Sequence, residues 1–191
     1  MPETEDTRSA VLEAAIRLIA RGGLQAVSHR AVEAEAGVSH GTTTYHFGTR
    51  QNIVDAVLEH LAARDMALAA ATSPSPAGTQ GAPDPGHAAD RLAAVLSGDR
   101  DYALARYELM LEAARRPELL PSLMRWRLSF TAGAEEMLRQ AGAASPRLAA
   151  HWLIAALDGL ILDGMCTGST DFRQHAHTIL PAMITTAMTI R

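Results

Sequence analysis

The segment from Val38 to Arg50, with the sequence VSHGTTTYHFGTR, contains many side chains that form hydrogen bonds. Three consecutive threonines and a serine supply hydroxyl groups, two histidines supply imidazole nitrogens, and a tyrosine and an arginine complete the set. Hydroxyl and imidazole groups can both donate and accept hydrogen bonds, so the segment is suited to recognising a polar surface. Its chemistry is that of binding, because it contains no pattern typical of a catalytic nucleophile.

The rest of the chain offers few groups for catalysis. We find no nucleophile motif, metal-ligand cluster or phosphate loop, and therefore expect no enzyme activity, no metal and no cofactor. The lone cysteine, Cys166, excludes an internal disulfide and a cysteine-based zinc site, and its apolar neighbours favour a packed thiol over a redox sensor. The alternative interpretation is a helical small-molecule-binding protein or an enzyme with an apolar cavity, for which Arg106, His151 and Asp158 would be the polar groups.

Composition predicts an all-α protein. Hydrophobic residues make up 48% of the 191 residues, enough for a sizeable core, and aromatics only 4%. Alanine and leucine are abundant, while the alternation typical of strands is scarce. No apolar run approaches the roughly 20 residues of a membrane span, and the start of the chain is acidic where a signal peptide is basic. We therefore expect no membrane partner and a cytoplasmic location.

Charge alone does not predict a nucleic-acid partner. The net charge is -4, and all 17 basic side chains are arginines. The first 60 residues carry five arginines against eight acidic residues. A domain that binds nucleic acid is usually basic, so such a function has to rest on local geometry in this chain.

Helix-capping signals divide the N-terminal part of the chain into four expected helices. The first begins near Thr7 and ends at a pair of glycines, 22 and 23, and the second runs over 28–36 with Ser28 as its cap. Gly37 supplies a tight turn, and Ser39 is expected to cap a third helix that extends to about residue 46. Thr49 caps a fourth. We expect the first three helices to form one domain over 1–48 and the fourth to be a connecting helix over 49–71.

The stretch from 72 to 86 is rich in Pro, Gly and Ser and is expected to be a flexible linker. Helices are expected after it at about 87–97, 101–115, 118–141, 146–166 and 171–190. These segments form a second domain over 87–191 and bring the expected total to nine helices. The 146–166 segment is apolar on nearly all sides and is expected to be buried.

A capped helix, a glycine turn and a second capped helix are typical of a helix-turn-helix. Several short pieces stand at fixed offsets: Ala36-Gly37-Val38-Ser39, Gly41-Thr42, Tyr45-His46-Phe47 and Thr49-Arg50. On these pieces the chain, from about residue 7 to 61, resembles the DNA-binding region of the TetR/AcrR family of one-component transcriptional regulators. The resemblance implies an N-terminal three-helix DNA-binding domain and a C-terminal helical domain that binds a small effector and forms a homodimer.

The same resemblance implies a repressor that binds a palindromic operator as a dimer and is released by a small apolar or amphipathic effector. The chain departs from the family's pattern at three places. Glu33 stands where alanine is usual, Thr43-Thr44 where Leu-Tyr is usual, and Arg50 where lysine is usual. The first departure places a carboxylate near the interior or near DNA, where His29 or Arg30 is a candidate partner.

Two kinds of DNA contact are expected in this region. The helix N-termini at Ser28 and at Thr49-Arg50 are expected to contact phosphates, and so is Tyr45. The hydroxyl and imidazole groups of the third helix are expected to contact base edges. One of Thr43 and Thr44 alternatively faces inward, and His46-Phe47 are expected to pack rather than touch DNA. The candidate DNA contacts are Ser28, His29, Arg30, Ser39, His40, Thr42, Thr43, Thr44, Tyr45, Thr49 and Arg50.

The second domain offers candidates for an effector pocket, since methionine and aromatic side chains adapt to apolar ligands. Arg106 either pairs with a structural carboxylate, Asp158 or Asp163, or anchors an anionic or carbonyl-bearing effector. Small residues in the 146–166 helix permit close approach, so we expect the homodimer to form through the last two helices. The candidate pocket residues are Tyr102, Arg106, Met110, Trp126, Phe130, His151 and Asp158.

Overall fold

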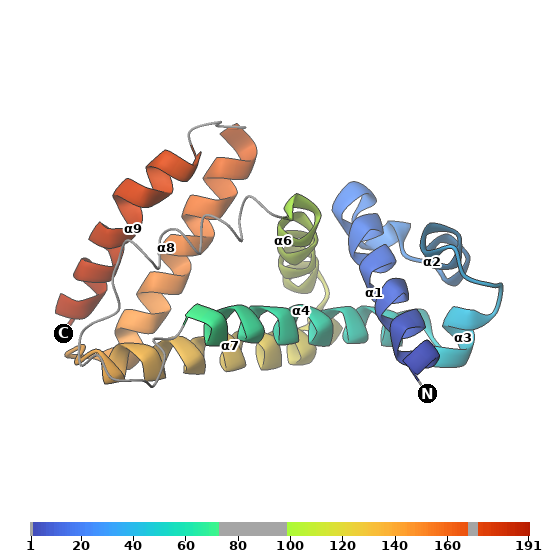
Figure 1. Ribbon diagram of the computed structural model, residues 1–191, viewed down its shortest axis with the longest axis horizontal. Helices are drawn as coiled ribbons and strands as arrows, with labels where there is room; N and C mark the ends of the chain where they lie inside the picture. The colour runs from blue at the N-terminus through green and yellow to red at the C-terminus, as the bar shows by residue number, and fades with distance from the viewer. Residues whose placement is uncertain (1, 73–98, 168–171) are drawn as a thin grey trace. The chain divides into compact units, whose positions relative to one another are not determined.

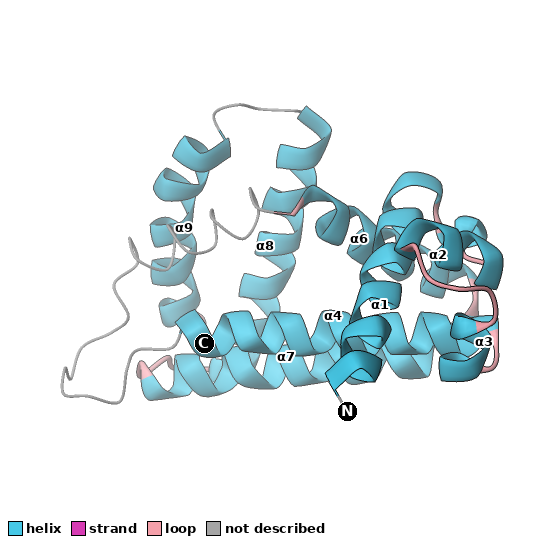
Figure 2. Cartoon of the chain, turned by 45° about the vertical axis from the view of Figure 1, so that its right-hand side comes forward, coloured by secondary structure: helices cyan, strands magenta, loops and turns pink. Residues whose placement is uncertain are grey.

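The computed structural model describes residues 2–72, 99–167 and 172–191, and in these ranges every regular element is a helix (Figure 1, Figure 2). The prediction of an all-α protein is confirmed. The elements are α1 (Pro2–Gly22), η1 (Leu24–Ala26), α2 (His29–Ala36), α3 (Thr42–Phe47), α4 (Arg50–Thr72), α6 (Arg100–Arg115), η2 (Pro117–Leu119), α7 (Leu120–Gln140), α8 (Pro146–Thr167) and α9 (Phe172–Thr189), where η marks a 3-10 helix.

Most of the expected helices are present with boundaries close to those predicted. The described residues form eight of the nine expected α-helices. The predicted helix at 87–97 and nearly all of the predicted linker at 72–86 lie outside the described residues. The clearest difference is α1, which begins at Pro2 rather than near Thr7. Proline suits the first turn of a helix, because the N–H group that it lacks has no partner inside the helix there.

The chain divides into two compact units, each described by itself. Unit 1 combines residues 1–64 with 101–127, and unit 2 contains 65–100 and 128–191. The predicted division differs, because it assigns α6 and the start of α7 to the second domain. The long helices α4 and α7 each contribute residues to both units.

One hydrophobic core holds unit 1 together. Apolar side chains spaced three and four apart on α1, including Val11, Ile16 and Ile19, are almost fully buried. They belong to the same core as Ile53 of α4 and Leu109 of α6. The three helices of the N-terminal region therefore pack on α4 and α6 and form a fixed support for the turn between α2 and α3.

The core of unit 2 is built by the second half of α7 with α8 and α9. Its buried members include Leu138, Leu153, Leu180 and Met183. The expectation that α8 is buried on nearly all sides is wrong for the single chain, where Leu148, Trp152 and Leu162 are 53%, 37% and 46% exposed. Cys166 is also exposed, so the expectation of a packed thiol is wrong as well.

Among the described residues, α8 is the one helix that is long and apolar enough to cross a membrane by length and composition. The helix is interrupted by His151, Asp158 and Asp163, so it does not contain the unbroken apolar run of about 20 residues that the sequence was expected to lack. A single such helix is weak evidence for a membrane span, because the core helix of a soluble protein meets the same test.

Candidate DNA-binding site

In the α2–turn–α3 segment, α2 and the glycine turn that follows it have the geometry predicted from the sequence. Ser28 precedes α2 in an extended conformation, and its Oγ accepts a hydrogen bond from the N–H of Ala31 at 3.2 Å. This is the predicted N-cap. Gly37 follows α2 with a φ of 67°, a left-handed conformation that side chains with a Cβ rarely adopt. The helix therefore ends in a turn that directs the chain toward α3.

The start of α3 differs from the prediction. The helix begins at Thr42, and its N-cap is Gly41, with a φ of 90° and no side chain to accept a hydrogen bond. Ser39 is thus not the cap that we predicted. The cap is supplied by another helix: Glu33 Oε1 on α2 accepts hydrogen bonds from the N–H groups of Gly41 at 2.9 Å and Thr43 at 3.1 Å. A carboxylate at a helix N-terminus also interacts favourably with the helix dipole.

Thr43 faces the interior, which corrects its prediction as a DNA contact. Its side chain is fully buried, and its Oγ1 donates a hydrogen bond to Glu33 Oε1 at 2.7 Å. Thr44, its neighbour along α3, is exposed. The alternative that one member of this pair faces inward is therefore confirmed, and the outward member is Thr44.

The Glu33 carboxylate is buried, at 4% exposure, and its partners differ from those expected. His40 Nδ1 lies 3.1 Å from Oε2, and no bond to Arg30 is among those that the described residues form with this carboxylate. The hydrogen bond from the Thr43 hydroxyl lowers the pKa of Glu33, burial opposes it, and the backbone N–H groups and His40 lower the pKa further. Glu33 is therefore a carboxylate anion at neutral pH.

Arg50 has a structural role that the sequence did not reveal. Its Nε donates to the carbonyl oxygen of Val27 at 2.7 Å, and its terminal nitrogen bonds the carbonyl of Leu24. Both carbonyls belong to the turn that joins α1 to α2. Next to it, Thr49 Oγ1 accepts from the N–H of Asn52 at 3.2 Å, so Thr49 caps α4 as predicted.

The remaining candidate DNA contacts have accessible side chains. Tyr45 is 83% exposed, and its ring lies edge-on to that of His46 with the centroids 5.2 Å apart. Thr42 and His29 are half-buried. The exposed members of the set are, besides Tyr45, Ser28, Arg30, Ser39, His40, Thr44 and Thr49. These residues form the candidate DNA-binding surface, defined by the start of α2, the turn, the outer side of α3 and the start of α4.

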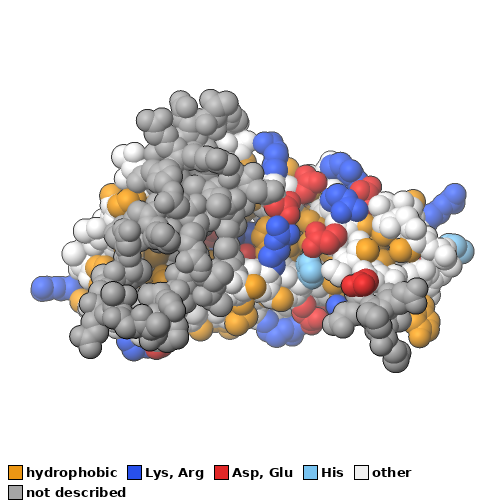
Figure 3. Space-filling view, in the orientation of Figure 1, with side chains coloured by type: hydrophobic (Ala, Val, Ile, Leu, Met, Phe, Trp, Pro, Cys, Tyr) orange, Lys and Arg blue, Asp and Glu red, His pale blue; other side chains and the backbone are white. Residues whose placement is uncertain are grey.

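Nearby charges are largely paired. Glu35 on α2 accepts hydrogen bonds from Arg17 Nε at 2.8 Å and from Arg21, both on α1. These bonds from Arg17 and Arg21 lower the pKa of Glu35. Among the described side chains drawn in Figure 3, blue arginines lie close to red acidic groups, and no large patch of one sign covers the face shown. The candidate DNA-binding surface therefore offers hydrogen-bonding groups more than a concentration of positive charge.

The candidate effector residues do not gather in one described pocket. Tyr102, Arg106, Met110 and Trp126 belong to unit 1, and Phe130, His151 and Asp158 to unit 2. Tyr102 is a core residue that donates from its hydroxyl to the carbonyl of Leu61 at 2.7 Å. The Arg106 guanidinium lies 5.1 Å from the centre of the Trp126 ring, a cation–π distance.

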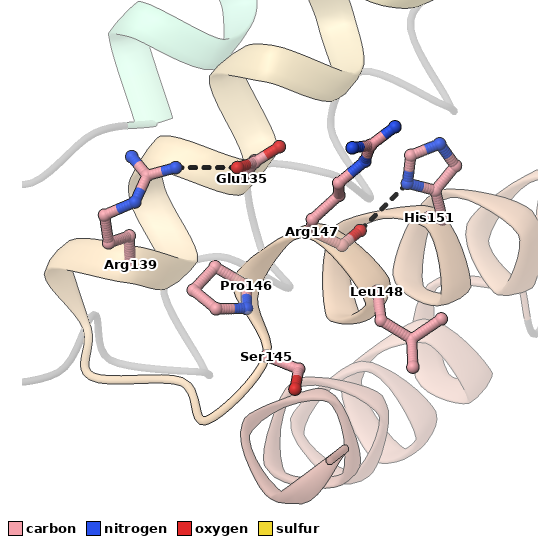
Figure 4. Close-up of a pocket in the computed structure, with 7 residues that line it drawn as sticks. All are labelled: Glu135, Arg139, Ser145, Pro146, Arg147, Leu148 and His151. Carbon is pink, nitrogen blue, oxygen red and sulfur yellow. Dashed lines mark hydrogen bonds and ion pairs between the residues drawn. The ribbon is translucent and has the colours of Figure 1, made fainter.

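A surface hollow of about 520 Å³ lies in unit 2, where α7 ends and α8 begins (Figure 4). His151 is the only effector candidate that lines it. Its Nδ1 donates to the carbonyl of Arg147 at 2.8 Å. On α7, Arg139, which also lines the hollow, forms an ion pair with Glu135 at 2.7 Å. Among the described residues, no group of three or more histidine, cysteine or acidic side chains is placed to hold a metal ion.

Sequence reasoning missed the role of Glu33, although it marked the residue as a departure. The signal was the simultaneous presence of Glu33 and Thr43 where the resembled family has an alanine and a leucine. Two polar residues that replace two apolar ones inside one small domain are expected to bond each other, since each would be costly alone.

The geometry of α2, its left-handed glycine turn and a short α3 with an exposed polar side defines a helix-turn-helix protein of the DNA-binding class. Comparisons with known proteins agree. Residues 11–57 match the family model described as "Bacterial regulatory proteins, tetR family", and residues 83–186 match "Tetracyclin repressor-like, C-terminal domain". The chain belongs to the TetR family of transcriptional regulators.

Individual relatives support this assignment. A TetR-family member from Streptomyces coelicolor A3 is 31% identical with a TM-score of 0.73, over 93% of this chain and 97% of that one. The multidrug binding protein EbrR, solved with malachite green, is 33% identical with a TM-score of 0.66, over 92% and 96% of the two chains. A transcriptional repressor of Mycobacterium tuberculosis is 44% identical over 57 residues, and this match spans only 30% of each chain.

Proposed function

We propose that the protein is a transcriptional repressor that binds a palindromic DNA operator as a homodimer and is released by a small effector. The observation that carries this proposal is the two-sided character of α3. Its inner side is held by Phe47, which is buried in the core, and by Thr43, which bonds the buried Glu33 carboxylate. Its outer side leaves Thr44 and Tyr45 exposed. A short helix with one fixed side and one free polar side is suited to the major groove.

We assign the contacts within this surface by side-chain chemistry. His40, Thr42 and Thr44 are proposed to meet base edges, with Arg30 beside them at the start of α2. Ser28, Thr49 and Tyr45 are proposed to contact phosphates, where helix N-termini contribute backbone N–H groups. Arg50 is proposed to support this surface from behind, because two of its nitrogens already bond backbone carbonyls.

The homodimer is proposed to form through α8 and α9. One side of α8 carries residues at spacings of four and three that are all exposed in the single chain: Leu148, Trp152, Ala155, Gly159, Leu162 and Cys166. Such spacing is that of a helix-packing seam. A Cβ added at Gly159 would meet nothing within 4 Å, so the centre of the seam is open to a second helix. An apolar stripe of this length is expected to be covered in the working protein.

The effector is proposed to be a small apolar or amphipathic molecule. EbrR, which is 33% identical over 92% of this chain and 96% of its own, has been solved with malachite green. Arg106 near the Trp126 ring adds a positive charge to an aromatic setting, which favours an effector with an anionic or carbonyl group. We further propose that the protein works in the cytoplasm and without catalysis, as is typical of this family of regulators.

The proposal is tested by selecting binding sites from random duplex DNA with the full-length protein and measuring affinity by gel shift. The expected result is a palindromic consensus whose two half-sites lie about 10 base pairs or more apart, centre to centre. Mass spectrometry of the natively purified protein then identifies a retained small molecule, which is added back to the gel shift. Failure to enrich any sequence would overturn the proposed operator binding. An effector that leaves DNA affinity unchanged would overturn the proposed release.

A further inference from the structure

The Glu33 carboxylate organises the whole N-terminal end of α3. Its Oε1 accepts three hydrogen bonds, from the N–H of Gly41 and from the N–H and hydroxyl of Thr43, at distances of 2.9, 3.1 and 2.7 Å. Its Oε2 lies 3.1 Å from His40 Nδ1. Since Gly41 has no side chain to cap α3, this carboxylate supplies the side-chain cap of the helix and links its first turn to α2.

These contacts also determine which ring nitrogens carry protons. A carboxylate accepts only, so the His40 nitrogen that faces it is an Nδ1–H donor. The Thr43 hydroxyl has one proton, which it gives to Glu33, and it therefore accepts from His29 Nδ1 at 2.9 Å. Both histidines thus have the proton on Nδ1. In the neutral ring the outer nitrogen, Nε2, is then a hydrogen-bond acceptor.

An apolar pair could fill the same space but would not impose this order. Hydrophobic contacts are not directional, whereas a buried carboxylate is stable only when its oxygens meet donors at defined positions. A buried polar group of this kind restricts the arrangements that helices can adopt, as single polar residues do in coiled coils. The Glu33–Thr43 pair therefore selects one position of α3 and one tautomer of His40.

We propose that Glu33 is a positioning residue for base recognition, and that through it His40 presents Nε2 as an acceptor for an exocyclic amino group of adenine or cytosine. In the major groove only these two bases expose such a donor. His40 is suited to this contact because its side chain is 94% exposed while its Nδ1 is held against the carboxylate. This inference rests on the proposed DNA binding and specifies which chemistry the surface reads.

The test compares Glu33→Gln with Glu35→Gln in the full-length protein. Both change a glutamate on α2, but Glu35 pairs with Arg17 and Arg21 on α1 and has no contact with α3 among its described bonds. The amide of Glu33→Gln presents a donor toward His40 and favours the opposite tautomer. We expect the ratio of affinities for the selected site and for random DNA to fall about tenfold in Glu33→Gln and to stay unchanged in Glu35→Gln.

A second readout follows the tautomer directly. The carbon and nitrogen chemical shifts of the His40 ring, measured by NMR, are expected to report Nδ1–H in the wild type and Nε2–H in Glu33→Gln. A double variant, Glu33→Ala with Thr43→Leu, replaces the polar pair by an apolar one and guards against simple loss of folding. This double variant is expected to fold, and its ratio of affinities for the selected site and for random DNA is expected to be as low as that of Glu33→Gln.

The outcomes separate this inference from the proposed function. If the wild type selects a DNA site and the double variant has the wild-type affinity ratio, the Glu33–Thr43 pair serves packing only and the inference is overturned. The inference is also overturned if the ring chemical shifts of His40 in Glu33→Gln are the same as in the wild type. If the wild type itself selects no site, the proposed function fails first, and the inference falls with it.

Discussion

Arg50 Nε donates a hydrogen bond to the carbonyl oxygen of Val27 at 2.7 Å, so the first residue of α4 is fixed to the turn that leads into α2. A second bond from the same guanidinium reaches the carbonyl of Leu24 in η1. The chain between α1 and α2 forms only a short 3-10 helix, Leu24–Ala26, and Arg50 adds a side-chain contact to it. Arg50 therefore connects the helix that leaves the DNA-binding region to the helix that carries Glu33.

Replacing Arg50 is expected to affect stability more than DNA contacts. Arg50→Ala leaves two carbonyl oxygens without their charged donor and is expected to lower the free energy of unfolding by about 2 kcal/mol. The measurement is urea unfolding at a fixed protein concentration, with the exposed Arg30→Ala as the matched control. Unchanged stability together with a weaker salt dependence of DNA binding would instead support the phosphate contact that the sequence predicts for Arg50.

The ion pairs of Glu35 with Arg17 and Arg21 are expected to contribute a pH-dependent part of the free energy of unfolding. The pKa of Glu35 is lowered from 4.5 by Arg17 and Arg21, so the folded state binds its proton less readily than the unfolded state does. This contribution is fully present above the ordinary pKa and is lost as the pH falls through the lower, folded-state value. The stability difference between wild type and Glu35→Gln is therefore expected to be largest at neutral pH and to shrink below pH 4.5.

This prediction is checked by urea unfolding of both proteins across the acid range. Glu59→Gln, which changes an exposed carboxylate on α4, is the control and is expected to differ little from the wild type at any pH. A Glu35→Gln difference that stays constant down to the lowest pH would show that the ion pairs with α1 contribute nothing that depends on ionisation.

How far the fold follows from the sequence depends on the range of the interactions involved. Ser28 and Thr49 were predicted as caps because each bonds an N–H group three residues later, and such local patterns are legible in one sequence. The start of α3 was not predicted, because its cap comes from Glu33 on another helix. The inward side of Thr43 follows from the same contact. Neither can be assigned before the two helices are placed together.

Arg50 illustrates the same limit for the candidate site. Its position at a helix N-terminus is typical of a phosphate contact, and that position was predicted from the sequence. Its partners are carbonyls more than twenty residues earlier in the chain. The sequence therefore predicts a candidate surface but does not separate the residues that form it from those, such as Arg50, that support it.

Gly37 is expected to be required for its backbone conformation alone. A Cβ added there would meet nothing within 4 Å, yet its φ is 67°. Gly37→Ala is therefore expected to destabilise the protein by about 1 kcal/mol through backbone strain. Gly133 within α7 is a matched control, because its Cβ would also meet nothing within 4 Å but its φ is not positive. Gly133→Ala is expected to stabilise by up to about 1 kcal/mol.

Urea unfolding of these two variants separates strain from crowding. If both substitutions stabilise the protein, then the left-handed conformation at Gly37 is not a constraint on the turn. If both destabilise it, crowding by a partner that covers α7 becomes the better explanation for Gly133.

The exposed stripe on α8 is expected to control dimerisation and, through it, DNA affinity. Ala155 lies in the stripe between Trp152 and Leu162 and is exposed in the single chain. Ala155→Glu therefore preserves the folded protomer but places a charge in the proposed seam. Sedimentation is expected to show a monomer, and affinity for the palindromic site is expected to fall at least about a hundredfold, because two linked half-sites gain affinity from simultaneous binding.

The control is Ala114→Glu, an exposed position on α6, which is expected to remain dimeric. A dimer that survives Ala155→Glu unchanged would mean that the subunits meet through another surface.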